Sequence, residues 1–200
     1  MNLPSSLRRL IDELSDLPSI GPRQATRLAF TLFGRGRDTV LNLAEALSGI
    51  TTIKTCASCF FVYENEGAVC SICADRARAK DIVMIVEKET DLISIENTGR
   101  FKGRYLVVGQ VPKTGLLESW QQKRLTTLRA ALAALPGGKA KEIILGFNPT
   151  ALGDFHASVI SKELQPLTEK LSRLGRGLPQ GGEIEFADDE TLGSALDSRN

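Results

Sequence analysis

Apolar side chains recur every three or four residues over the first fifty positions of the chain. They form three runs, Leu7 to Leu14, Ala25 to Leu32 and Val40 to Leu47, and segments containing glycine separate these runs. This spacing places the apolar residues of each run on one face of a helix, and glycine and proline tend to end helices. The pattern therefore predicts a small helical module over residues 1 to 52.

Farther along, apolar residues follow one another in short blocks. The blocks are Ile82-Val83-Met84-Ile85-Val86, Tyr105-Leu106-Val107-Val108 and Glu142-Ile143-Ile144-Leu145. Continuous runs of this kind are typical of parallel strands that are buried on both faces. Helical spacing returns at residues 91–96, 121–135 and 159 to about 170. The alternating order predicts an α/β domain with a parallel sheet over residues 81 to 176, and an α+β multidomain protein as a whole.

The last segment, residues 177 to 200, is expected to be a C-terminal arm. Glycines surround Pro179. Polar and apolar residues alternate from Glu183 to Phe186, as in a short strand, and a weak helical pattern follows at Thr191 to Leu196. These elements are too short to build a core of their own.

All four cysteines fall between residues 53 and 80, where the periodic patterns disappear. Cys56 and Cys59 form one Cys-x-x-Cys pair, and Cys70 and Cys73 form a second pair after ten intervening residues. Two such pairs joined by a hairpin can bring four sulfurs to the corners of a tetrahedron, which is how zinc binds thiolates. Buried thiols or two disulfides are the alternative, but the clustering favours a reducing compartment and a metal. The spacing predicts a four-cysteine zinc finger that binds one zinc ion.

The zinc site is expected to be structural. Four thiolates fill the four positions around zinc and leave none for a water molecule or a substrate. We therefore assign no catalytic role to the metal.

Composition and charge restrict the possible functions. Apolar residues make up 42% and charged residues 24% of the chain, which excludes wholesale disorder. The net charge of +1 provides no global field for nucleic acid, so any DNA contact must rest on a local basic face. No basic-then-apolar leader opens the sequence and no apolar run approaches the ~18 residues of a membrane span. We expect a cytoplasmic protein without a membrane partner.

The segment Leu17-Pro18-Ser19-Ile20-Gly21-Pro22-Arg23-Gln24-Ala25 resembles the hairpin of a helix-hairpin-helix motif. In that motif Gly21 would permit close approach to a phosphate, and backbone amides of the next helix would bind it. Arg23 and Arg27 lie one turn apart and would add charge-assisted hydrogen bonds. The alternative is a scaffold whose hairpin only joins two helices and never meets DNA.

Candidate chemistry in the α/β domain lies at the ends of its first and third strands. Glu87 follows the first strand, and Asn148 and Asp154 follow the third. Ligand sites of parallel sheets lie at such strand ends. These two segments resemble the Toprim domain of primases and topoisomerases, in which a glutamate and two aspartates bind magnesium and manage phosphoryl transfer.

The Toprim resemblance is incomplete at the magnesium ligands. Asn148 and Thr150 stand where that family carries its two aspartates, and Leu152 stands where a further glutamate is common. The two remaining carboxylates, Glu87 and Asp154, make a poor magnesium clamp. We therefore expect no magnesium-dependent cleavage or synthesis; a Toprim-type nuclease or topoisomerase-like enzyme with an unrecognised third ligand is the alternative.

Two single residues also bear on function. His156 is the only histidine; near the start of a helix we expect it to be partly exposed and assign it no role. Trp120 stands ahead of a predicted helix in a polar stretch, and we expect it to anchor that helix, with an exposed partner contact as the alternative.

The order of these parts is similar to that of the bacterial RecR family of recombination mediators. A helix-hairpin-helix, a four-cysteine module, a degenerate Toprim domain and the tail Gly177-Leu178-Pro179-Gln180-Gly181-Gly182-Glu183-Ile184-Glu185 follow one another over nearly the whole chain. The resemblance implies a non-enzymatic protein that works with RecO, and separately with RecF, to help load RecA onto single-stranded DNA. It also implies a DNA-binding ring or clamp formed by self-association, associated with the nucleoid.

The resemblance further implies that the Toprim-like domain is a docking surface for partners, with Glu87, Asn148 and Asp154 as its contact residues. Self-association would also concentrate several copies of Arg23 and Arg27 around single- or double-stranded DNA, although each subunit is nearly neutral. The chain departs from the family in the connection 109–117, which is shorter than the usual loop, so the choice of partner or its affinity can differ here.

Overall fold

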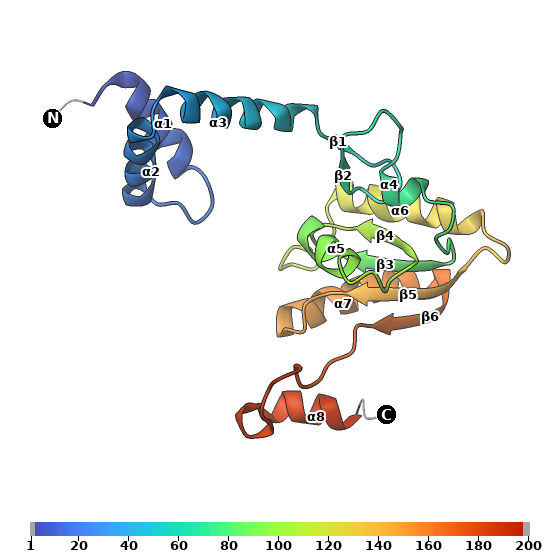
Figure 1. Cartoon of the computed structure of the whole chain (residues 1–200). Helices are drawn as coiled ribbons and strands as arrows, with labels where there is room; N and C mark the ends of the chain where they lie inside the picture. The colour runs from blue at the N-terminus through green and yellow to red at the C-terminus, as the bar shows by residue number, and fades with distance from the viewer. Residues whose placement is uncertain (1–2, 198–200) are drawn as a thin grey trace. The chain divides into compact units, whose positions relative to one another are not determined.

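The computed structural model describes residues 3–197, which divide into two compact units. We call Met1–Ile53 the helical unit and Lys54–Asn200 the sheet unit; Figure 1 shows the elements of each. No helix in the described residues is both long enough and apolar enough to cross a membrane.

The helical unit contains the three helices that the apolar spacing predicts. They are α1 (Ser5–Ser15), α2 (Pro22–Gly34) and α3 (Arg37–Gly49), and a 3-10 helix, η1 (Ile50–Thr52), follows them. Pro22 occupies the first turn of α2, where its missing N–H is not needed. Ala25 and Ala29 are fully buried, and their small side chains let α2 pack closely on its neighbours.

The sheet unit begins with the cysteine segment. Two short antiparallel strands, β1 (Lys54–Thr55) and β2 (Val62–Tyr63), form a hairpin, and the one-turn helix α4 (Ser71–Ala74) follows. The first cysteine pair therefore lies in the hairpin and the second lies at α4.

A four-stranded parallel sheet forms the centre of this unit and confirms the predicted fold class. Its strands are β3 (Ile82–Val86), β4 (Arg104–Val107), β5 (Ala140–Gly146) and β6 (Thr168–Arg173), in the order β4-β3-β5-β6. The helices between them are α5 (Glu89–Glu96), α6 (Ser119–Ala133) and α7 (Ala151–Leu164), which the 3-10 helix η2 (Gln165–Leu167) follows. Chain order reverses between the adjacent strands β3 and β5, so a topological switch point lies at their carboxyl ends.

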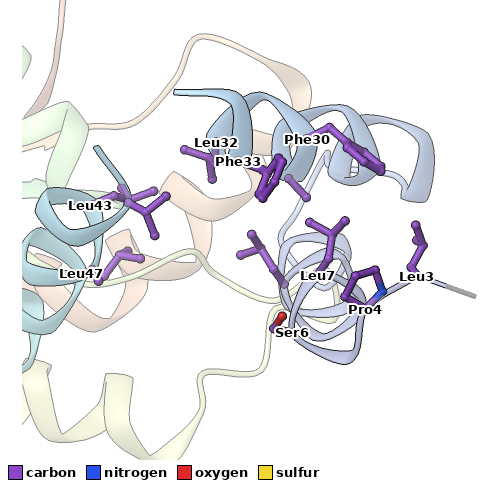
Figure 2. Close-up of a pocket in the computed structure, with 13 residues that line it drawn as sticks. Leu3, Pro4, Ser6, Leu7, Phe30, Leu32, Phe33, Leu43 and Leu47 are labelled. Carbon is purple, nitrogen blue, oxygen red and sulfur yellow. The ribbon is translucent and has the colours of Figure 1, made fainter. Parts of the chain in front are cut away.

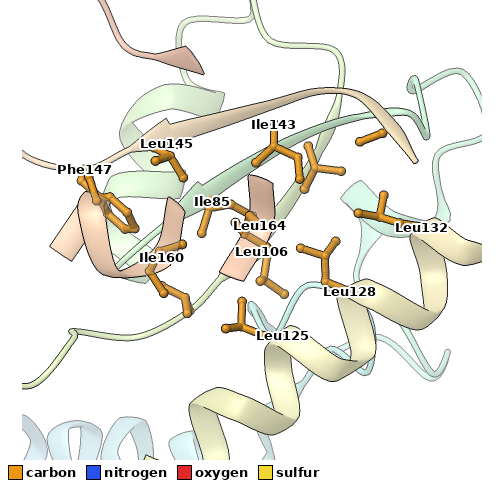
Figure 3. Close-up of a cluster of buried hydrophobic side chains, with 14 of the residues drawn as sticks. Ile85, Leu106, Leu125, Leu128, Leu132, Ile143, Leu145, Phe147, Ile160 and Leu164 are labelled. Atoms are coloured by element: carbon orange, nitrogen blue, oxygen red, sulfur yellow. The ribbon is translucent and has the colours of Figure 1, made fainter. Parts of the chain in front are cut away.

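Alternate residues of the strands face two different cores. One core packs the sheet against α6 and α7 through buried apolar residues such as Ile85, Leu125 and Ile160 (Figure 3). The other core contains Met84 and Val86 of β3, Leu92 of α5 and the four cysteines. The helices α6 and α7 thus cover one face of the sheet, whereas α5 and the cysteine segment cover the other.

The prediction of a helix over residues 159 to about 170 was wrong at both ends. The helix α7 begins earlier, at Ala151, where the side chain of Thr150 accepts a hydrogen bond from Gly153 N at 3.1 Å. It stops at Leu164 because Pro166 cannot continue the helix. The following residues form β6, which pairs with β5 and was not predicted.

The C-terminal arm differs from the prediction in one element. Ile184–Phe186 form the 3-10 helix η3 in place of the expected strand, because no described strand pairs with them. The expected short helix is present as α8 (Asp189–Asp197).

Candidate metal centre and nucleic-acid interface

The four cysteines meet in one buried cluster. Cys56, Cys59, Cys70 and Cys73 each offer a sulfur, and all four sulfurs lie within 4.8 Å of one another. The Sγ atoms of Cys59 and Cys70 are 3.5 Å apart. Four sulfurs around zinc at about 2.3 Å would be separated by about 3.8 Å, so this spacing fits tetrahedral metal coordination. No other group of three or more metal-ligating side chains occurs within residues 3–197.

The chemistry of the thiols also fits a metal ion. Hydrogen bonds with Cys70 and Cys73, together with burial, raise the pKa of the Cys59 thiol, whereas hydrogen bonds with Cys59 and Cys73 lower the pKa of Cys70. Four sulfurs this close cannot all carry a negative charge unless a cation neutralises them. A bound metal ion would supply that charge and hold the segment together.

The cysteine segment is attached to the edge of the sheet by hydrogen bonds to its backbone carbonyl groups. Val107 N of the edge strand β4 donates a hydrogen bond to Cys59 O at 2.9 Å, and Arg104 Nη1 donates to Cys73 O at 2.9 Å. Each Cys-x-x-Cys pair is therefore attached to β4 by one hydrogen bond.

Arg124 ties the cysteine hairpin to α6 as well. Its guanidinium carbon lies 5.1 Å from the ring centre of Phe60 and 4.7 Å from that of Trp120, and its Nη1 donates to Val107 O at 2.8 Å. Trp120 is 41% exposed, and its Nε1 donates to Glu118 Oε2 at 2.5 Å. Trp120 therefore contacts residues of its own helix and its N-cap, and the anchoring role stays a prediction.

In the helical unit, a tight hairpin presents the two candidate DNA-binding arginines. Ser19, not Gly21, adopts the left-handed conformation of the turn (φ 68°). Gly21 is the N-cap of α2 in an extended conformation, and a Cβ atom built there would meet nothing within 4 Å. Arg23 and Arg27 are exposed on α2, and no ion pair to either is found among residues 3–197. The start of α2 is thus open and carries two cations that no carboxylate neutralises.

The carboxyl ends of β3 and β5 come together as predicted, with Val86 paired to Gly146. The environment of Glu87 differs from the expectation of an accessible carboxylate. Glu87 is 5% exposed, and its Oε1 lies 2.5 Å from Nδ1 of His156 on α7. His156 is only 1% exposed, so the expectation of a partly exposed histidine was wrong. It faces the sheet because it lies on the buried side of α7.

The second carboxylate of this edge, Asp154, is also engaged. Arg173 Nη2 lies 2.6 Å from Asp154 Oδ1, and Arg176 binds the same oxygen. The hydrogen bond from Arg176 and then that from Arg173 hold the pKa of Asp154 below its usual value. Asn148 is exposed beside these residues, and its carbonyl oxygen would be 2.0 Å from a Cβ atom at position 153, so only glycine fits there.

The helical unit also has an exposed apolar groove of about 550 Å³ between its three helices (Figure 2). Leu7 of α1, Phe30 and Phe33 of α2 and Leu47 of α3 are among the residues that line it. Phe33 is 77% exposed and Leu47 is 58% exposed. Exposed apolar patches of this kind mark contact surfaces in folded proteins.

Sequence reasoning missed three contributors to these sites: His156, the Arg173–Arg176 pair and Arg124. His156 gave a signal, because a lone histidine followed by Ala157 and Ile160 lies on the apolar face of its helix. The arginines gave none, since only the folded chain brings them to Asp154 and to the rings of Phe60 and Trp120.

Comparison with known families matches three segments of the chain. Residues 7–50 match the family described as "RecR, helix-hairpin-helix", residues 81–175 match "Toprim domain", and residues 177–200 match "RecR, C-terminal".

Whole-chain relatives are similar over nearly the full length. A protein named "Recombination protein RecR" from Acidothermus cellulolyticus (strain ATCC 43068 / DSM 8971 / 11B) is 39% identical over 196 residues, covering 96% of this chain and 95% of that protein. Proteins of the same name from Roseiflexus sp. (strain RS-1) and Dehalococcoides mccartyi (strain ATCC BAA-2266 / KCTC 15142 / 195) are each 37% identical. The first covers 98% of this chain and 94% of its own length, and the second covers 99% and 97%.

Proposed function

Because the chain belongs to the RecR family of recombination proteins, we propose that it is a non-catalytic, DNA-binding mediator of recombinational repair. In this proposal it acts with RecO and with RecF on the nucleoid to help load RecA onto single-stranded DNA. The observation that carries the DNA-binding part is the open start of α2, where Arg23 and Arg27 are exposed beside Gly21. Backbone amides at a helix start together with two unpaired cations are suited to a phosphate of either single- or double-stranded DNA.

The non-catalytic part is supported by the carboxyl edge of the sheet. Glu87 is buried against His156 and Asp154 is neutralised by Arg173 and Arg176, so both carboxylates already have partners. Asn148 adds no charge. We assign this edge to docking of RecO or RecF, with Asn148 and Asp154 at the surface and Glu87 beneath them, next to the short 109–117 connection.

The metal in this proposal is one structural zinc ion. Four buried thiolates favour zinc over the harder cations that prefer oxygen, and they leave no open coordination position. Zinc would hold the cysteine hairpin and α4 together on the edge of the sheet.

Self-association is the last part of the proposal. The apolar groove of the helical unit is open, and in this proposal the same surface of a second copy of the chain covers it. A closed ring would place several copies of Arg23 and Arg27 around one DNA molecule and strengthen weak single contacts.

DNA binding at low salt tests this function. The purified zinc-loaded protein should bind single- and double-stranded DNA, and Arg23→Ala with Arg27→Ala should weaken binding to both without lowering zinc content or thermal stability. Arg9→Ala with Arg37→Ala, which removes the same charge elsewhere in the helical unit, is the matched control. Absence of DNA binding by the wild-type protein, alone and with RecO, would refute the proposal. Magnesium-dependent cleavage that is lost in Glu87→Gln would instead establish the enzymatic alternative.

A further inference from the structure

A basic hollow lies at the amino-terminal edge of the sheet, where β3, β5 and β6 begin. It has a volume of about 550 Å³, and five cationic residues line it: Arg76, Arg78, Lys80, Lys139 and Lys141. This is the opposite end of the strands from Glu87 and Asp154. The hollow is therefore separate from the edge that we assign to partner proteins.

The fold gathers these cations from segments that are far apart in the sequence. Residues 76–80 lead from the cysteine segment into β3, and Lys139 and Lys141 flank the start of β5. Lys141 N donates a hydrogen bond to Asp81 O at 2.8 Å, which holds the two segments side by side. The parallel pairing of β3 with β5 thus determines that the charges converge.

Four of the five cations are available to a ligand. Arg76, Lys80, Lys139 and Lys141 are exposed, and none of them takes part in an ion pair within the described residues 3–197. Arg78 is different, because it binds Glu96 and donates to Gly103 O at 3.2 Å. These contacts of Arg78 hold in place the segment that carries Arg76 and Lys80.

The acidic residues of the hollow do not cancel this charge. Asp81 and Glu169 are the carboxylates that line it, against the four cations that have no ion-pair partner among residues 3–197. The whole chain has a net charge of only +1, so the hollow concentrates positive charge on one part of a nearly neutral protein. Such a local field attracts a polyanion even when the total charge does not.

The remaining lining indicates what kind of polyanion fits. Leu135 and Pro136 are its apolar members, and the hollow contains no aromatic side chain. Protein partners are usually held by several buried aromatic or aliphatic anchors, whereas this surface offers only Leu135 and Pro136 and no aromatic side chain. A sugar–phosphate backbone needs only spaced lysines and arginines.

We infer that this hollow is a second DNA-backbone site, built on the sheet unit and independent of the hairpin arginines. The inference rests on the proposed DNA-binding function and extends it to a surface outside the helix-hairpin-helix. Contacts with phosphates carry no base specificity, so the site takes single- or double-stranded DNA of any sequence.

The experiment compares variants that each lack two lysine charges. DNA binding is measured for each across a range of salt concentrations. Lys139→Gln with Lys141→Gln should weaken binding by roughly tenfold or more at low salt and reduce the slope of log affinity against log salt by about 0.7 to 0.9 per lysine. Lys123→Gln with Lys162→Gln removes the same charge from exposed positions on α6 and α7 and should leave both quantities unchanged. Zinc content and thermal melting confirm that each variant is folded.

Acetylation footprinting gives an independent readout on the wild-type protein. Bound DNA should protect Lys80, Lys139 and Lys141 from acetylation and leave Lys123 and Lys162 reactive.

If wild-type protein binds DNA and only the Arg23→Ala, Arg27→Ala variant is impaired, this inference fails while the proposed function stands. If the wild type binds no DNA, both fail. Protection and affinity loss seen with polyglutamate but not with DNA would also overturn it.

Discussion

At the end of β3, a buried carboxylate and a buried imidazole meet in a position that Toprim enzymes would use for magnesium. Glu87 and His156 lie 2.5 Å apart, and the other ring nitrogen of His156, Nε2, is buried without a hydrogen-bond partner in the described structure. The pair occupies the switch point between β3 and β5. Both side chains are almost fully buried beneath these strand ends.

Removing the imidazole should destabilise the sheet unit. His156→Ala leaves the buried Glu87 carboxylate without its partner and opens a cavity beside it, so the free energy of unfolding should fall by at least about 2 kcal/mol. Urea denaturation measures this fall. Ser158→Ala, an exposed position on the same helix, serves as the control and should stay within about 0.5 kcal/mol of wild type. An unchanged unfolding free energy in His156→Ala would show that the pair contributes nothing.

Among the elements, the cysteine segment depends most on a bound ion, because its strands have two residues each and its helix has four. Cys59→Ser should abolish stoichiometric zinc binding and lower the thermal stability of the sheet unit. Amide hydrogen exchange should rise over residues 54–80, while α2 stays protected. Ser58→Ala, beside the mutated cysteine, should retain zinc. Full zinc occupancy in Cys59→Ser would contradict the four-thiolate site.

The C-terminal arm should respond to acid through Asp154. The two arginines lower the pKa of Asp154 in the folded protein, so the contact is complete above the ordinary aspartate pKa of about 4 and is lost as the pH falls through the lower folded value. NMR chemical shifts of residues 173–177 should therefore hold steady down to about pH 4 and change below it. Asp154→Asn should produce the changed shifts already at about pH 7.

The comparison variant for the arm is Glu163→Gln, on the same helix as Asp154. It breaks the ion pair of Glu163 with Arg129 of α6 and leaves Asp154 untouched. Its shifts over residues 173–177 should match the wild type. Identical acid titrations in wild type and Asp154→Asn would show that Asp154 does not hold the arm.

Elements with strong local signals were predictable, and those decided by tertiary contacts were not. The strand at residues 82–86 was predicted with its exact bounds. Both faces of this parallel sheet are covered, so every residue of the strand has to be apolar, and the apolar run ends where the strand ends. In contrast, Leu164, Leu167 and Leu171 keep helical spacing beyond the end of α7, and Pro166 ends that helix despite the spacing. Polar and apolar residues alternate over residues 183–186 as they do in a strand. A strand also needs a second strand to pair with, and sequence spacing does not show whether one is present.

The candidate sites divide in the same way. The spacing alone predicted that the four cysteines come together, because chelation of one ion requires such spacing. The attachment of that cluster to β4 uses the backbone hydrogen bond from Val107 to Cys59 and one from the Arg104 side chain to Cys73 O, and neither acceptor depends on the identity of its side chain. The basic hollow could not be predicted from the sequence for another reason. Its cations come from two segments that are far apart in the sequence and meet only when β3 pairs with β5.

On the scale of the whole molecule, the two units differ in how well they bury their apolar residues. The sheet unit has two cores, whereas in the helical unit Ala25 and Ala29 are the buried residues and large side chains such as Phe33 remain exposed. A unit with so much exposed apolar surface is stabilised by association.

Acidic residues in the groove should therefore prevent assembly. Phe33→Asp with Leu47→Glu should weaken self-association by at least about tenfold, as measured by sedimentation velocity, because a charge would have to be buried in the contact. DNA affinity should fall with it, since multivalency is lost. Leu116→Asp, the same kind of change at an exposed site of the sheet unit, should leave assembly intact. A wild-type protein that stays monomeric at all concentrations would contradict the ring.

The attachment of the cysteine segment to β4 has a consequence for the life of the protein in a cell. β4 is an outer strand of the sheet, and a naked outer strand is a template for uncontrolled pairing between molecules. The hairpin of the cysteine segment shields that strand, because Cys59 O accepts the N–H of Val107. If the site holds zinc as proposed, oxidation of the cysteines or scarcity of zinc should uncover that strand, and the protein should then precipitate or be degraded more readily.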